Sequence, residues 1–250
     1  MNAGKYVGDE LGIFARAVAW KGYFGAILRP YIGGNVLEVG AGIGATTAVL
    51  CNNKVRLWVC LEPDPEHVRT LAERIEKEDL PPVCRANLGT LQDIDKSDCF
   101  DTILYVDVLE HIADDRSEVL CAASRLNANG TLVVLSPAHP WLFTDFDRAI
   151  GHYRRYTKAS LTALKPAECR LERLLYLDSL GMLLSLGNRL LLKQSMPTMS
   201  QIRFWDRWVV PLSRSLDPLL DFSVGKSIVA VWRKSSLSKA ASAESESSTG

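Results

Sequence analysis

The segment Glu-Val-Gly-Ala-Gly-Ile-Gly at residues 38–44 combines a carboxylate with three closely spaced glycines. Glycine adopts backbone conformations that other residues avoid, and its lack of a Cβ lets a ligand approach the main chain. Such a turn between a strand and a helix can bind a nucleotide-containing cofactor. Because Glu62 follows Gly42 by twenty residues, the pattern also fits a nicotinamide dinucleotide site, and the turn alone leaves both interpretations open.

Further carboxylates follow the predicted strands of the same region. Glu38 stands in the mouth of the glycine turn, Glu62 and Asp64 follow the second strand, and Asp107 and Glu110 follow the fourth. A carboxylate at Glu38 would repel a pyrophosphate and attract an ammonium or sulfonium group. Any one of these residues could instead cap a helix. The whole set, in this order and spacing, favours a binding site for a cationic cofactor.

The elements that must position these residues alternate along the chain. Short β-rich runs and helical patterns follow one another between residues 35 and 136, which predicts a parallel sheet with helices on both faces. The predicted strands are 35–39, 56–62, 82–85, 101–106 and 131–136, and the predicted helices are 10–31, 45–52, 66–78 and 116–127.

Two later β-rich runs, at 170–177 and 226–233, are separated by a long stretch rich in Leu, Trp, Pro and Met. A connection between strands usually has about 2–6 residues, so we expect a helical insertion at about 178–225. The Ser/Ala/Glu-rich residues 235–250 are expected to be a disordered tail. The predicted organisation is one domain at 1–234, with N-terminal helices or a lid at 1–34, a cofactor-binding core at 35–136 and an acceptor-side half at 137–234.

With these motifs the chain resembles the class I S-adenosylmethionine-dependent methyltransferases, in particular the group of quinone-biosynthesis C-methyltransferases and small-molecule methyltransferases. The resemblance runs from about Asn35 to Ser136. It implies an α/β, Rossmann-like seven-stranded sheet of order 3-2-1-4-5-7-6 whose last strand is antiparallel. The implied cofactor is S-adenosyl-L-methionine, with S-adenosyl-L-homocysteine as product.

The resemblance also implies a role for individual residues. Glu38 and the glycine turn would surround the methionine part of the cofactor, and Glu62 would accept hydrogen bonds from the ribose hydroxyls. Asn87 stands where the family often has an aspartate, and its amide oxygen can accept the same bond from adenine. The implied cofactor contacts are Glu38, Gly40, Ala41, Gly42, Gly44, Glu62, Pro63, Asp64, Asn87, Leu88, Asp107 and Val108.

The segment Gly-His-Tyr-Arg-Arg-Tyr at 151–156 is similar to one that follows the fifth strand in a bacterial subgroup of these enzymes. Arg154 and Arg155 could form bidentate bonds to a phosphate or carboxylate of the acceptor. Alternatively, they could form salt bridges that anchor a following helix at 158–164, capped by Thr157. Substrate contact is the favoured interpretation, and both stay open at this point.

Imidazole titrates near neutral pH, so histidines are the candidate bases. His152 adjoins the two arginines, and His111 lies beside the cofactor according to the family pattern, where a structural role is equally reasonable. Tyr153, Arg154 and Arg155 complete the predicted catalytic set with these two histidines. The chain has no Cys-x-x-Cys, no His pair at zinc spacing and no acidic residue in the segment 136–141 that directly follows the fifth strand, so we expect no metal and an in-line methyl transfer.

The 29 basic and 29 acidic residues give a net charge of zero, which argues against a protein that holds nucleic acid by charge alone. The charge is unevenly distributed. Residues 1–135 carry 13 basic and 19 acidic side chains, a net of −6, whereas residues 136–234 carry 15 and 8, a net of +7. The basic second half predicts an anionic acceptor, either a small molecule or a glycan- or lipid-linked compound.

The six widely spaced cysteines and an N-terminus without the apolar run of a signal peptide predict a cytoplasmic protein. The apolar stretch 174–192 contains Asp178, Asn188 and Arg189, so no membrane span is expected and peripheral contact stays open. A monomer and a homodimer are both compatible with the sequence. The alternative functions are a non-catalytic S-adenosylmethionine-binding module and, less favoured, an NAD(P)-dependent oxidoreductase.

Overall fold

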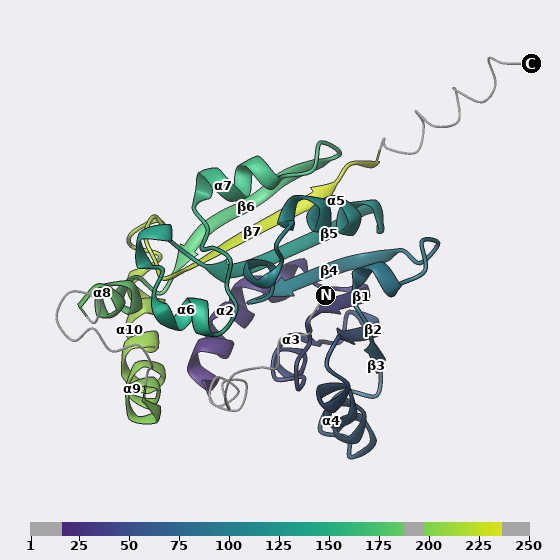
Figure 1. Cartoon of the computed structure of the whole chain (residues 1–250), viewed down its shortest axis with the longest axis horizontal. Helices are drawn as coiled ribbons and strands as arrows, with labels where there is room; N and C mark the ends of the chain where they lie inside the picture. Colours follow the sequence, from purple (N-terminus) through teal and green to yellow (C-terminus); the bar gives the residue numbers. More distant parts are fainter. Residues whose placement is uncertain (1–16, 188–197, 237–250) are drawn as a thin grey trace, which may run out of the picture.

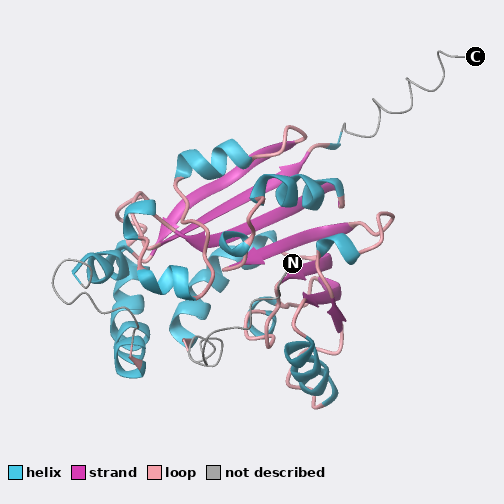
Figure 2. Cartoon of the chain, in the orientation of Figure 1, coloured by secondary structure: helices cyan, strands magenta, loops and turns pink. Residues whose placement is uncertain are grey.

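The computed structural model describes residues 17–187 and 198–236. Its centre is a seven-stranded sheet with the order β3-β2-β1-β4-β5-β7-β6 (Figures 1 and 2). The strands β1 to β5 run parallel, and β7 runs antiparallel to both β5 and β6. The predicted sheet is therefore confirmed. The strands are β1 (Gly34–Val39), β2 (Val55–Glu62), β3 (Cys84–Leu88), β4 (Phe100–Val106), β5 (Leu126–Pro137), β6 (Cys169–Leu177) and β7 (Ser227–Lys234).

Helices cover both faces of the sheet because successive side chains of a strand point to opposite faces. In β4, Leu104 joins one buried cluster, while Ile103 and Tyr105 join the other. The first cluster packs against α2 (Val18–Leu28), α3 (Thr47–Leu50), α4 (Pro65–Glu76) and α10 (Val210–Leu216), and the second against α5 (Asp115–Ser124) and α7 (Lys158–Leu164).

The predicted helical insertion lies between β6 and β7, where α8, α9 and α10 gather at one end of the sheet (Figure 1). It consists of α8 (Ser179–Gly187), α9 (Met199–Phe204), a π-helical turn (Trp205–Val209) and α10. The insertion holds the N-terminal helix: Asp206 accepts hydrogen bonds from the main-chain N–H groups of Ala19 and Trp20, at 3.2 and 2.9 Å. The Tyr23 hydroxyl donates to the buried Asp217, 2.6 Å away. α2 thus contacts both the insertion and α3.

Several boundaries differ from the predicted ones. The third strand is Cys84–Leu88, later than the predicted 82–85. The fifth strand begins at Leu126, five residues before the predicted start. Its pairing with β4 shifts register between Phe100 and Thr102, so that the additional residues of β5 lie between the partners of these two residues. The short helix α6 (Asp145–Ala149) was not predicted, and a capping box formed by Thr144 and Asp147 starts it.

Parts of the predicted organisation lie outside the described residues. These are residues 1–16 of the predicted N-terminal helices or lid, residues 188–197 of the predicted insertion and residues 237–250 of the predicted tail. Within the described ranges, none of the helices combines the length and the apolar character that a bilayer crossing needs. None of the six cysteines forms a disulfide bond.

Candidate active site

The predicted cofactor residues come together at the carboxyl edge of the parallel strands. Val39 pairs with Leu61 in β2 and with Tyr105 in β4, and Leu61 pairs with Asn87 in β3. The glycine turn, Glu62, Leu88 and Asp107 directly follow or end these four strands, so one edge carries them all. Ligands of open parallel sheets bind at this edge.

The glycine turn needs its glycines for both conformation and space. Gly40, Gly42 and Gly44 have φ of +69°, +55° and +78°, in the left-handed region that other residues rarely adopt. A Cβ on Gly40 would lie 2.6 Å from a methyl of Val108, and one on Gly44 would lie 2.8 Å from Leu71. Val108, a predicted cofactor residue, therefore packs directly against the turn.

Glu62 links the glycine turn to the loop after β2. Its side chain is buried, and its two oxygens accept hydrogen bonds from the N–H groups of Gly42 (2.8 Å) and Asp64 (3.1 Å). The His67 ring nitrogen lies 3.5 Å from the same carboxylate. Because a carboxylate offers about four acceptor positions, these contacts leave room for the predicted ribose hydroxyls.

Glu38 is buried beneath the turn. One of its oxygens, Oε2, accepts hydrogen bonds from the Thr47 hydroxyl (2.5 Å) and the Trp58 indole (2.8 Å). Burial raises the pKa of Glu38 to about 7, and the two donors oppose that rise. The other oxygen, Oε1, receives no hydrogen bond from the described residues, so it is the atom that could face a cationic ligand.

The raised pKa of Glu38 predicts a pH-dependent loss of stability. In the folded state the Glu38 carboxyl keeps its proton up to about pH 7, whereas in the unfolded chain the carboxyl loses this proton near pH 4.5. The folded state therefore binds the extra proton, and its stability relative to Glu38→Gln should fall by about 2–3 kcal/mol as pH rises from 4.5 to 7. Urea unfolding of both proteins at pH 5 and pH 8 measures this difference, and parallel pH curves for the two would contradict it.

The predicted adenine-side residues lie at the open side of this edge. The Asp64 carboxylate accepts hydrogen bonds from the N–H groups of Glu66 and His67, so it caps α4. Pro63, Asn87 and Leu88 are exposed. Their contact with a cofactor stays a prediction, as does that of the other assigned residues.

Asp107 stands at the end of β4 with a φ of +54°, and its N–H donates to the Leu135 carbonyl at 2.8 Å. Its side chain is accessible to solvent, yet the dense protein around the carboxylate raises its pKa to about 6. The positive charges of Lys226 and Lys21 oppose that rise, as does His152 when its ring is protonated. Neither lysine was predicted from the sequence. Lys226 directly precedes the antiparallel β7, which places it beside the end of β5, and its ammonium lies 4.5 Å from the Trp205 ring centroid.

Both arginines of the segment 151–156 have partners within the chain. Arg154 lies 2.8 Å from the Asp115 carboxylate and also donates to the Ala113 carbonyl. Arg155 donates from Nε and Nη2 to the buried Asp147, at 2.9 Å each. Thr157 caps α7, as predicted. These ion pairs match the anchoring alternative, and acceptor contact by the arginines stays a prediction.

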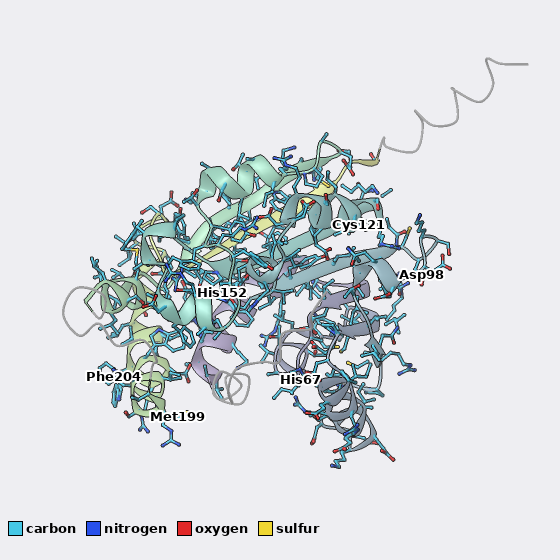
Figure 3. All side chains as sticks on the ribbon, in the orientation of Figure 1. His67, Asp98, Cys121, His152, Met199 and Phe204 are labelled. Atoms are coloured by element: carbon cyan, nitrogen blue, oxygen red, sulfur yellow. The ribbon has the colours of Figure 1, made fainter. Side chains whose placement is uncertain are left out.

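His152 and His111 do lie together, with ring centroids 4.5 Å apart. His152 Nδ1 lies 3.0 Å from Asp147, and its Nε2 lies 3.9 Å from the fully buried Glu110. Burial lowers the pKa of His111 to about 4 and raises that of Glu110 well above its usual range. Figure 3 shows His152 on the α6 side of the sheet edge and His67 on the α4 side. Tyr153 is exposed, and Arg154 lies over its ring.

Comparison with known proteins agrees with this geometry. Residues 37–133 match a family described as "Methyltransferase domain". A search of curated proteins found no significant match. An S-adenosylmethionine-dependent methyltransferase from Clostridium acetobutylicum is 11% identical with a TM-score of 0.56, and the match covers 91% of this chain and 96% of that one.

Two further solved structures share the fold. Coclaurine N-methyltransferase bound to N-methylheliamine and S-adenosylhomocysteine is 13% identical with a TM-score of 0.58, covering 87% of this chain and 72% of that one. The N-methyltransferase NodS from Bradyrhizobium japonicum is 14% identical with a TM-score of 0.54, covering 91% and 99%. At these identities the likeness defines the fold.

The match to a methyltransferase domain at residues 37–133 and the sheet order indicate methyl transfer from S-adenosylmethionine as cofactor. The antiparallel β7 inserted between β5 and β6 differs from the all-parallel 3-2-1-4-5-6 order of dinucleotide-binding domains, which disfavours the oxidoreductase alternative.

Proposed function

We propose that the chain transfers the methyl group of S-adenosylmethionine to a small-molecule, or a glycan- or lipid-linked, acceptor that carries an anionic group. The observation that supports an anionic acceptor is the pair of lysines whose positive charges act on Asp107, namely Lys226 and Lys21. Asp107 ends β4 beside the glycine turn, so these charges adjoin the edge where the cofactor residues gather.

The residues present suit the cofactor. The glycine turn and Glu62 lie at the same edge of the sheet, where the Gly42 N–H donates to the Glu62 carboxylate. Glu38 would attract the cationic methionine part, and Glu62 would accept the ribose hydroxyls. S-adenosylmethionine, when bound, supplies an electrophilic methyl group on a sulfonium.

The acceptor side is built differently from the sequence-based expectation. Arg154 and Arg155 form ion pairs with Asp115 and Asp147. The Lys226 ammonium instead lies over the Trp205 ring, and the negative charges of Asp178 and Asp107 act to raise its pKa. Burial lowers the pKa of Lys226, so an anionic group placed beside it would favour its charged form. We therefore assign the anion-binding role to Lys226 rather than to the arginine pair.

Positioning accounts for most of the rate enhancement in a methyl transfer, because the reaction is an in-line displacement. A base is needed only when the acceptor must lose a proton first. His152 and His111 remain the predicted bases, and Asp107, ionised above about pH 6, is a further acceptor of such a proton.

A panel of carboxylic acids, each paired with its neutral methyl ester, tests the acceptor assignment through release of S-adenosylhomocysteine. The acids should be methylated in preference to the esters. Lys226→Met should raise the KM for an acid at least about tenfold, since it removes a charge-assisted hydrogen bond of about 1.5–3 kcal/mol. Its dissociation constant for S-adenosylhomocysteine should stay within about twofold of the parent.

Lys77→Met is the matched control, because Lys77 is exposed on α4 and pairs only with Glu73. It should leave the KM of the acids unchanged. Equal turnover of acids and esters, together with an unchanged KM in Lys226→Met, would reject the anionic acceptor while leaving cofactor binding to be judged separately.

A further inference from the structure

Three side chains with metal-binding atoms meet beside the end of β4. Glu110 and His111 belong to a 3-10 turn (Leu109–His111) that follows β4, and His152 comes from the loop after α6. One ligand atom from each lies within 4.8 Å of the others. Figure 3 places the labelled His152 inside the chain at this edge. Because 40 residues separate His111 from His152, no motif of fixed spacing could have predicted this group.

The carboxylate of Glu110 gives the first evidence that this group of three side chains binds a further partner. Its side chain is fully buried, and neither carboxylate oxygen has a hydrogen-bond partner among the described residues. The nearby Ser136 hydroxyl is also without a hydrogen bond there. Buried polar atoms are nearly always paired, and an unpaired buried carboxylate is costly. A positive partner for Glu110 would remove that cost.

The orientation of His152 points to the same location. Asp147 forms a two-bond ion pair with Arg155 and accepts hydrogen bonds from the N–H and hydroxyl of Thr144. Held as a carboxylate, Asp147 can only accept, so the His152 nitrogen 3.0 Å away, Nδ1, must carry the hydrogen. In the neutral ring the other nitrogen, Nε2, presents its lone pair on the side of Glu110 Oε1, 3.9 Å away.

A hydrogen bond cannot link His152 Nε2 to Glu110 Oε1 well, because their separation of 3.9 Å is beyond hydrogen-bond distance. A metal ion fits the separation better. Two ligand atoms bound to one tetrahedral Zn²⁺ at about 2.0–2.2 Å lie about 3.3–3.6 Å apart. The 3.9 Å between Nε2 and Oε1 exceeds this by a few tenths of an ångström, and the widest separation allowed within the group, 4.8 Å, would require an approach of about 1 Å.

We propose that Glu110, His111 and His152 bind one divalent cation of the zinc class. Two imidazoles and one carboxylate form a donor set that suits Zn²⁺ and leaves a fourth position open. Asp147 would hold the ligating ring of His152 by its other nitrogen, the usual arrangement for a metal-bound histidine. A histidine bound to a metal cannot also accept a proton from the acceptor, so this site gives His111 and His152 a different role from the predicted bases. It also differs from the sequence-based expectation that no metal binds.

The surrounding main chain already orders the two segments that supply the ligands. The Tyr153 N–H donates to the Glu110 carbonyl at 2.8 Å, and the His152 N–H donates to the Asp147 carbonyl at 2.8 Å. The loop therefore contacts the turn after β4 at Tyr153, the residue next to His152, and is also tied back to α6. Bound metal would add a link between the same two segments and should stabilise the folded chain.

Calorimetric titration of the full chain with Zn²⁺, after treatment with a chelator, tests the proposal. One ion should bind per chain, and saturating Zn²⁺ should raise the Tm. Glu110→Gln and His152→Gln should each weaken Zn²⁺ binding at least about tenfold and abolish the rise in Tm. The visible spectrum of bound Co²⁺ should report a site with nitrogen and oxygen ligands.

Glu73→Gln is the control, because Glu73 is exposed on α4, and it should bind Zn²⁺ like the parent. S-adenosylhomocysteine binding verifies that each variant is folded, and His111→Gln replaces any variant that is not. Absence of stoichiometric Zn²⁺ binding by the parent, or binding that all three ligand substitutions leave unchanged, would overturn the proposal. Loss of cofactor binding with intact Zn²⁺ binding would count against the proposed function alone.

Discussion

Replacing Asp147 by asparagine is expected to lower the free energy of unfolding by about 3–5 kcal/mol. Asp147 is buried and receives hydrogen bonds from Thr144, His152 and both Nε and Nη2 of Arg155. The substitution would leave the Arg155 guanidinium, which is itself largely buried, without its counter-charge. Urea unfolding followed by circular dichroism measures the loss.

Asp145→Asn is the matched control, because Asp145 lies two residues earlier on the same helix and pairs with Arg148 at the exposed surface. An exposed ion pair contributes about 0–1 kcal/mol, so this variant should unfold almost like the parent. If the two variants lost similar stability, the segment 151–156 would not be anchored through Asp147, and its arginines would again be available to the acceptor.

Glu62→Ala should weaken the binding of S-adenosylhomocysteine about 100-fold. The change removes the predicted acceptor of the ribose hydroxyls, and it also frees the N–H groups of Gly42 and Asp64 that shape the site. Each charge-assisted hydrogen bond contributes about 1.5–3 kcal/mol, and about 2.7 kcal/mol corresponds to 100-fold. Isothermal titration calorimetry gives the dissociation constants.

Glu66→Ala provides the comparison, since Glu66 is an exposed residue of the first turn of α4. Its affinity for S-adenosylhomocysteine should match that of the parent. An affinity for Glu62→Ala within about threefold of the parent, in a protein that unfolds normally, would show that Glu62 only supports the turn and does not contact the ribose.

The sheet was predictable because its signals are local. Each β-rich run from residue 35 onward ends in a polar or glycine-containing turn, and these runs became β1 to β5. The register shift in β5 was not predictable, because it depends on pairing with β4 across the sheet. The same holds for α2, whose first N–H groups are capped by Asp206 from the far end of the chain.

The site was predictable to the extent that its residues follow strands. Glu38, Glu62 and Asp107 reach one edge for that reason alone. Ion-pair partners cannot be assigned in this way: Arg154 finds Asp115 and Arg155 finds Asp147 only after the loop folds onto α5 and α6. Lys226 was not predicted, and Glu110 was noted only as one of the carboxylates after the fourth strand, because their importance lies in burial and in neighbours distant along the chain.

A crystal structure of the full chain grown with S-adenosylhomocysteine tests the central claim most directly. The account predicts the ligand at the carboxyl edge of β1 to β4, with its ribose hydroxyls on Glu62, its amino-acid part at the turn 40–44 beside Glu38, and its sulfur near Asp107. Binding of the ligand elsewhere, or crystals that show no ligand despite saturating concentrations, would contradict it.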